Sequence, residues 1–191
     1  MFFKKAAVLL SFALGAFALD PTKIKADLSN AKIIPDVLDD FDVASELRIT
    51  YHMTKQLKMG TPMTADETES PPHVWFPKTN EESQYTLVMF DADSSKPLTR
   101  QWIVTNIDGQ KPGTSVADMS DLHQYTRYEP VPKDSEPHRY VFTLFEQSAV
   151  NQTFVPPIKD LPQDRTGFDV KEFATKNNLR PVTAIYMSVQ N

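Results

Sequence analysis

The stretch Tyr85-Thr86-Leu87-Val88-Met89-Phe90 limits the folds that this chain can adopt, because nearly all of its positions are apolar. A strand with one wet face alternates apolar and polar residues, so a continuous apolar run predicts a central strand that is covered on both faces. Two carboxylates, Asp91 and Asp93, follow this run directly. We therefore expect a buried strand that ends in a charged loop.

The rest of the chain predicts further strands on both sides of residues 85–90. The 191 residues include 15 prolines and only 5 glycines, a composition that favours short strands joined by proline-containing loops. There is no internal repeat and no linker rich in Gly and Ser, so we expect a single domain over residues 19–191. The other predicted strands are residues 47–51, 73–76, 102–107, 140–145 and 182–189.

One helix is predicted near the C-terminus. Asp169 is a suitable N-cap, Glu172 follows three residues later, and Phe168 and Phe173 flank the pair as a hydrophobic staple. Asn177-Asn178 is a typical end for such a helix. Strands nevertheless dominate the pattern. The expected fold is therefore mostly β: an antiparallel β-sandwich with a few peripheral helices, including this one.

Residues 1–18 have the three parts of a secretory signal peptide. A basic start at Lys4-Lys5 precedes the apolar residues 6–18, and Ala16-Phe17-Ala18 supplies the small residues at which such signals are cut. The apolar run is shorter than the ~20 residues that span a bilayer. We therefore expect cleavage after Ala18 and secretion, to the outside or to a compartment of the secretory pathway such as a vacuole. An uncleaved anchor or a buried first helix is the alternative.

Charge and residue usage exclude several classes of function. The formal net charge of −5 becomes more negative once residues 1–18 are removed, so the chain lacks a basic surface for nucleic acid. The absence of cysteine excludes thiol catalysis and thiolate metal sites. No common hydrolase, metal-binding or nucleotide-binding string occurs, and we predict no catalytic residue, metal or cofactor. The sequon Asn151-Gln152-Thr153 can carry a glycan if the chain passes through a glycosylating pathway.

The candidate binding residues lie at the ends of predicted strands. Asp91 and Asp93 point the same way if the strand continues through them, and His138 stands at the mouth of the strand over residues 140–145. A carboxyl group that faces a histidine or an arginine can hold a phosphate or carboxylate group from two sides. The alternative is a turn, in which the aspartates bond their own backbone.

Five strings, taken in order, resemble the phosphatidylethanolamine-binding protein family, which includes Raf kinase inhibitor proteins, plant flowering regulators and yeast carboxypeptidase Y inhibitor. The similarity covers roughly residues 33–189, nearly all of the chain that follows the predicted signal peptide. The five strings are IIPDVLD (residues 33–39), YTLVMFDAD (85–93), WIVTNI (102–107), PHRYVF (137–142), and the segment from Phe168 to Val182.

This resemblance implies a β-sandwich with a small pocket at one end that binds phosphate-bearing molecules, including phospholipid head groups, without catalysis. By position, Asp91, Asp93, His138 and Tyr140 match the family's pocket residues. Gln101 stands where the family usually has a histidine. Because an amide cannot become cationic, this replacement is expected to weaken anion binding.

Two alternative functions remain open at this point. The resemblance to carboxypeptidase Y inhibitor implies a protease inhibitor or another protein-interaction module, although the segment before Ala31 is short here. An enzyme using Asp91, Asp93 and His138 as acid–base groups is the other, disfavoured because no activated nucleophile is evident. Around the pocket, Glu136 adds a carboxylate, while Lys96 or Arg100 would restore positive charge.

Overall fold

The computed structural model describes residues 19–77, 82–94, 98–108, 124–134, 136–157 and 160–190. Their strands form two sheets. The smaller sheet has the order β2-β1-β4, and the larger has the order β3-β9-β8-β5-β6-β7. The bounds are β1 Arg48–Tyr51, β2 Lys55–Gln56, β3 Thr61–Met63, β4 His73–Trp75, β5 Gln84–Asp91, β6 Thr99–Asp108, β7 Gln124–Thr126, β8 His138–Glu146 and β9 Arg180–Val189, with the helices α1 Pro21–Asn30 and α2 Val170–Lys176 and a short 3-10 turn at Asp66–Thr68.

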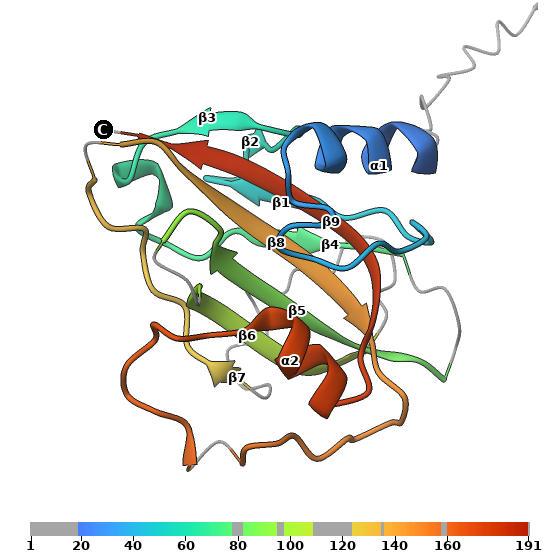
Figure 1. Cartoon of the computed structure of the whole chain (residues 1–191). Coiled ribbons are helices and arrows are strands. Elements are labelled where there is room, and N and C mark those ends of the chain that lie inside the picture. Colours follow the sequence, from blue (N-terminus) through green and yellow to red (C-terminus); the bar gives the residue numbers. More distant parts are fainter. Residues whose placement is uncertain are drawn as a thin grey trace, which may run out of the picture.

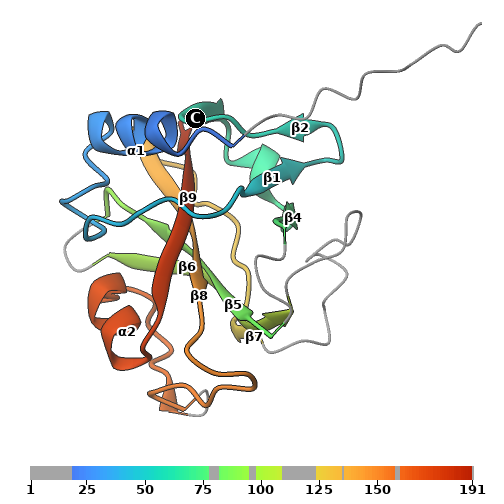
Figure 2. The same cartoon turned by 90° about the vertical axis from the view of Figure 1, so that its right-hand side faces the viewer.

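The molecule has three layers, with the six-stranded sheet in the middle (Figures 1 and 2). The small sheet covers one face of it, and α1 and α2 lie against the other face (Figure 2). β5 is central, and all eight of its residues are buried. Tyr85, Leu87 and Met89 join the apolar cluster that faces the small sheet, whereas Val88 and Phe90 join the cluster beneath the helices. The prediction of a strand covered on both faces is confirmed.

The predicted helix near the C-terminus is confirmed as α2. The Asp169 carboxylate accepts a hydrogen bond from the backbone N–H of Glu172 at 2.9 Å, which satisfies a donor that the first helical turn leaves unpaired. The rings of Phe168 and Phe173 lie 5.5 Å apart between centroids. At the other end, the Asn177 side-chain amide donates to the carbonyl of Phe173.

The helix α1 was not predicted. Its signals are present, because Asp20 caps the backbone N–H of Lys23 at 3.0 Å and Pro21 occupies the first turn. However, only Leu28 among its residues is buried, so the apolar stripe is too narrow to identify from periodicity. No helix in the part of the chain that the structure describes has the length and apolar character needed to cross a bilayer.

The pairing of β3 with β9 is parallel, which the expectation of an antiparallel sandwich did not include. The chain leaves the small sheet after β2 and crosses to the edge of the large sheet at Gly60. Gly60 has φ +71°, and a Cβ there would lie 2.9 Å from the hydroxyl oxygen of Tyr186. Its backbone N–H donates to the carbonyl of Tyr186 at 2.9 Å, so this crossing requires glycine.

Candidate functional site

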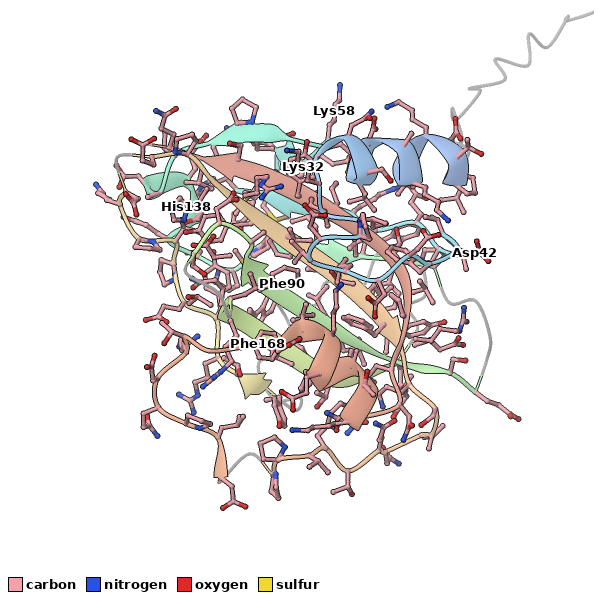
Figure 3. The ribbon with its side chains drawn as sticks, viewed as in Figure 1. Lys32, Asp42, Lys58, Phe90, His138 and Phe168 are labelled. Atoms are coloured by element: carbon pink, nitrogen blue, oxygen red, sulfur yellow. The ribbon has the colours of Figure 1, made fainter. Side chains whose placement is uncertain are left out.

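The register of two central strands brings Asp91 and His138 together. Asp91 is the last residue of β5 and His138 is the first of β8, and Asp91 is paired directly with Tyr140. The carboxylate of Asp91 is buried, and its Oδ2 lies 2.8 Å from Nδ1 of His138. Figure 3 shows His138 at the start of β8, at one end of the sheet. Residues far apart in the sequence thus form a carboxylate–imidazole pair.

Asp91 also closes the turn that follows β5. Its Oδ1 accepts hydrogen bonds from the backbone N–H groups of Asp93 at 2.9 Å and Ser94 at 3.1 Å. Asp91 therefore forms the turn that the Asp-x-Asp string allows, and it contacts His138 as well. One oxygen fixes the loop, which leaves the other oxygen rigidly aimed at His138.

Tyr140 forms the inner wall of the site. Residues opposite each other on paired strands share a face, so the phenol of Tyr140 lies on the same side of the sheet as the carboxylate of Asp91. Burial raises the pKa of this phenol far above 10.0, and the charge and hydrogen bond of Asp91 raise it further. Tyr140 therefore stays neutral, and its hydroxyl donates a hydrogen bond to the carboxylate of Asp91. Its ring stacks on that of His138 with an interplanar angle of 25°.

The second ring nitrogen of His138 faces another carboxylate. Nε2 lies 3.7 Å from Oδ2 of Asp134, whose side chain is half exposed on the segment before β8. Burial lowers the pKa of His138, but the hydrogen bond and charge of Asp91, with the charges of Asp134 and Asp93, raise it above 6.5 overall. The imidazole of His138 thus lies between two carboxylates, which favour its protonated form.

Asp93 does not join this pair. β5 ends at Asp91, and Asp93 accepts hydrogen bonds from Arg139, from the backbone N–H at 2.7 Å and from Nε at 2.8 Å. Arg139 alternates with His138 along β8, so its side chain lies on the opposite face and also donates to the carbonyl of Ala31. Burial raises the pKa of Asp93, but the guanidinium of Arg139 outweighs this and lowers it overall. The expectation that both aspartates point the same way fails because the strand ends between them.

Gln101 is buried in β6 at an irregularity in its pairing with β5. Its side-chain Oε1 has no hydrogen-bond partner among the described residues, and no hydrogen bond there links it to Asp91 or His138. Its backbone carbonyl accepts from Arg165 at 2.9 Å. Gln101 therefore carries an unused buried acceptor on the strand next to Asp91.

Arg100, one of the two possible sources of extra charge, has another partner. Arg100 is buried and donates to the carbonyl of Pro162, and Lys96 lies outside the described residues. Glu136 is exposed, and the carboxylate next to His138 belongs to Asp134 instead.

The resulting site carries both signs of charge. Its acidic groups are Asp91 and Asp134, and its basic group is the imidazole of His138, whereas Asp93 and Arg139 pair with each other on the opposite face. The described residues contain no cluster of three or more His, Asp or Glu side chains that could hold a metal ion. This arrangement suits the binding of a small polar group by hydrogen bonds and ion pairs.

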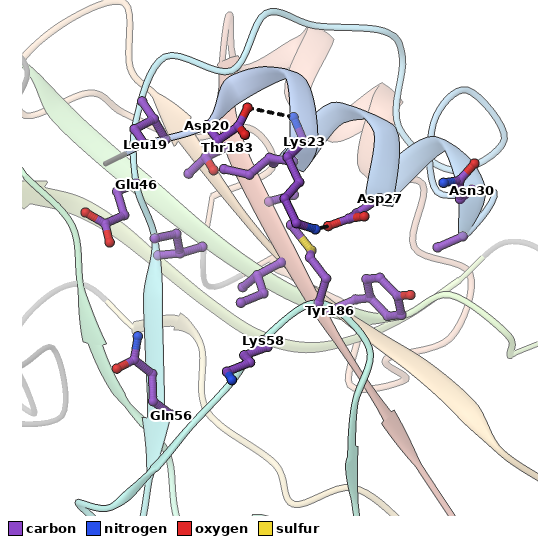
Figure 4. Close-up of a pocket in the computed structure, with 16 residues that line it drawn as sticks. Leu19, Asp20, Lys23, Asp27, Asn30, Glu46, Gln56, Lys58, Thr183 and Tyr186 are labelled. Carbon is purple, nitrogen blue, oxygen red and sulfur yellow. Dashed lines mark hydrogen bonds and ion pairs between the residues drawn. The ribbon is translucent and has the colours of Figure 1, made fainter. Parts of the chain in front are cut away.

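A separate hollow lies away from the Asp91–His138 pair. It has a volume of about 740 Å³ and lies between α1, β9 and the segment around β2 (Figure 4). Ile24, Leu47 and Ile185 contribute to its apolar lining. At its rim the ammonium of Lys23 pairs with Asp27 at 2.6 Å, which Figure 4 marks with a dashed line. The ammonium of Lys23 is thus already paired within α1.

Comparison with known proteins supports this description of the fold. A sequence profile described as Phosphatidylethanolamine-binding protein matches residues 40–187. Protein BROTHER of FT and TFL 1 from Arabidopsis thaliana is 31% identical over 166 residues, covering 83% of this chain and 88% of its own length. A phosphatidylethanolamine-binding protein from Plasmodium vivax superposes with a TM-score of 0.73 at 20% identity, covering 87% of this chain and 96% of that one.

Carboxypeptidase Y inhibitor, in its complex with the cognate proteinase, superposes with a TM-score of 0.68 at 19% identity, covering 90% of this chain and 96% of the inhibitor. At such identities the two solved structures support the fold alone. The fold and site define a β-sandwich with a carboxylate–imidazole pair at one end of its central sheet. The chain belongs to the phosphatidylethanolamine-binding protein family.

Sequence reasoning missed Asp134, which faces His138, and Arg139, which binds Asp93 on the opposite face. Arg139 lies between two predicted site residues, His138 and Tyr140, and strand alternation would have placed it on the opposite face. Asp134 precedes β8 in a segment without regular structure, so its approach to His138 had no signal in the sequence.

Proposed function

We propose that this protein is a secreted binding protein that recognises a phosphate-bearing small molecule or phospholipid head group at Asp91, His138 and Tyr140, without catalysis. Membership of the family supports the binding role. The observation that carries the proposal is the 2.8 Å contact between Asp91 and His138, because it creates a fixed cationic donor at a strand end. In this proposal the second nitrogen of His138 donates to a phosphate oxygen.

The charge balance favours a head group that also carries an amine. Two carboxylates, Asp91 and Asp134, and only one group that can become cationic, His138, face the site, so a bare phosphate meets net repulsion. A phosphate joined to an ammonium, as in phosphoethanolamine, matches both signs when its amine lies toward Asp134. Gln101 also favours a head group with an amine, because its neutral amide adds no positive charge for a phosphate to bind.

Isothermal titration calorimetry with phosphoethanolamine, phosphocholine and inorganic phosphate tests the proposal. We expect the protein to bind phosphoethanolamine more tightly than phosphate and His138→Ala to lose binding. His52→Ala is the matched control, because His52 is an exposed histidine in the β1–β2 turn. Equal binding by wild type and His138→Ala, or no heat with any of these compounds, would remove the site from consideration.

Secretion is the second part of the proposal, and it rests on the pattern of residues 1–18. Expression of the full-length chain in a yeast host, followed by N-terminal sequencing of the protein in the medium, tests it. The expected first residue is Leu19. Retention of the whole chain inside the cell would contradict this part and leave the binding assay unaffected.

A protease inhibitor, or another protein-interaction module, is the alternative function. The similarity to carboxypeptidase Y inhibitor extends over most of both chains, but its low identity supports only the shared fold. An assay of a serine carboxypeptidase in the presence of the purified protein separates the two functions. Inhibition that persists in His138→Ala would favour the alternative.

A further inference from the structure

The sequon Asn151-Gln152-Thr153 lies on a turn that the binding site does not use. β8 begins at His138 and ends at Glu146, and the turn follows that far end. Nine residues of strand span about 26 Å at roughly 3.3 Å per residue. Any group attached here lies at the opposite end of the sheet from the Asp91–His138 pair.

The turn holds its backbone firmly and leaves its sequon side chains in solvent. Asn151 has φ +52°, and its backbone N–H donates to the side-chain oxygen of Gln84 at 2.7 Å. The carbonyl of Gln152 accepts from the side chain of Asn106 at 3.3 Å. Asn151 and Thr153 are both exposed, and neither side chain takes part in a hydrogen bond among the described residues. A substituent on Asn151 would displace nothing from the fold.

A second, independent observation concerns the surface around this turn. Large apolar side chains that are exposed are few in the described part of the chain, and Val150 and Val155 are two of them, each 53% exposed. Val150 lies one residue before Asn151 and Val155 four residues after it, so a group attached to Asn151 starts between two exposed apolar side chains of the same loop.

We propose that Asn151 carries an N-linked glycan whose first sugars cover Val150 and Val155. The donor is an oligosaccharide linked to a polyprenyl pyrophosphate in the lumen of the secretory pathway. A bond forms between Nδ2 of Asn151 and the anomeric carbon of the first N-acetylglucosamine. The bond from that carbon to the pyrophosphate oxygen breaks, the pyrophosphate leaves with the electron pair, and the amide gives up one proton to a base. This inference rests on the secretion proposed above.

Translation of the full-length chain with endoplasmic-reticulum microsomes tests the attachment. We expect a protease-protected product of lower mobility, which peptide N-glycosidase returns to the mobility of the unmodified chain. Asn151→Gln and Thr153→Ala lose the shift, and Thr153→Ser, which keeps a hydroxyl at the sequon, retains it. Circular dichroism of the variants confirms that they fold.

The outcomes separate this inference from the proposals on which it depends. A protected chain without the shift, or a shift that persists in Asn151→Gln, overturns the glycan and leaves secretion standing. An unprotected chain overturns both the glycan and secretion, whereas the calorimetry of the binding site is independent of either result.

The covering role has its own measurement. We expect secreted Asn151→Gln to bind more of an apolar fluorescent dye than the glycosylated wild type. Adding Val150→Ser and Val155→Ser to that variant returns dye binding to the level of the wild type. Equal dye binding by Asn151→Gln and the wild type would overturn the cover.

Discussion

In the proposed function, Asp134 is the residue that distinguishes the two kinds of ligand, because it places a carboxylate 3.7 Å from Nε2 of His138. Replacing it by asparagine removes repulsion toward phosphate and removes the partner that we assign to the amine. We expect Asp134→Asn to bind inorganic phosphate more tightly and to lose roughly two- to five-fold of the preference for phosphoethanolamine, the effect of a partly exposed charge worth about 0.4–1 kcal/mol.

Calorimetry with both compounds measures this preference. Glu136→Gln is the matched control, since Glu136 is a neighbouring exposed carboxylate and the one that the sequence suggested. An unchanged ratio of affinities in Asp134→Asn would contradict the position assigned to the amine.

His138 links stability to pH. Its pKa is raised in the folded protein above 6.5, so the folded state favours the imidazolium. Its contribution to the free energy of unfolding is therefore fully present below pH 6.5 and is lost as the pH rises through the folded-state pKa. We expect wild type to lose stability over that window relative to His138→Gln.

Urea denaturation at a series of pH values measures this difference, and an NMR titration of the ring gives the pKa itself. If the two proteins show parallel pH profiles across that window, the ion pair with Asp91 is not formed in solution.

At the scale of single elements, the turn between β1 and β2 contains two residues with strained backbone conformations. His52 and Met53 have φ +50° and +62°, although neither is glycine, and the side chain of Met53 is exposed. A left-handed conformation at a non-glycine residue lowers the free energy of unfolding by about 1–2 kcal/mol. A glycine at the same position avoids this strain, but its more flexible unfolded state lowers the free energy of unfolding by about 0.4–1 kcal/mol. We therefore expect Met53→Gly to raise the free energy of unfolding by roughly 0.5–1 kcal/mol.

Chemical denaturation measures the change, with Thr54→Gly as control. Thr54 is the next residue and is not among those with positive φ, so its replacement should destabilise the protein. Stabilisation by both variants would mean that the effect does not come from the left-handed backbone.

The whole molecule should unfold as one unit, because β5 supplies side chains to both apolar clusters. Leu87 is fully buried between the two sheets, and Leu87→Ala should cost about 2–5 kcal/mol through lost burial and a residual cavity. Trp102 belongs to the same cluster as Leu87, whereas α2 packs on the other face of the sheet.

Tryptophan fluorescence and far-ultraviolet circular dichroism therefore report on different layers. We expect their unfolding transitions to coincide in wild type and to shift together in Leu87→Ala. Separate transitions would show that the helical layer unfolds independently of the sandwich.

The sequence by itself determined the six strands β1, β4, β5, β6, β8 and β9, the helix α2 and the family, but not the strands β2, β3 and β7. The unbroken apolar run before Asp91 indicated a central strand, and the Asp169–Glu172 spacing indicated a cap, because both signals are local and each is read within a few residues. The choice of Asp91, His138 and Tyr140 as site residues also came from local strings, through the resemblance to the family.

Only the tertiary structure decided which of these residues meet. The direction of the Asp93 side chain depends on where β5 ends. Because β5 ends at Asp91, Asp93 binds Arg139 on the opposite face instead of His138. Asp134 reaches His138 from an irregular segment that no periodicity describes. Contacts of this kind depend on strand register and on the path of the chain, which bring together groups that are distant in the sequence. The pattern of neighbouring residues therefore does not predict them.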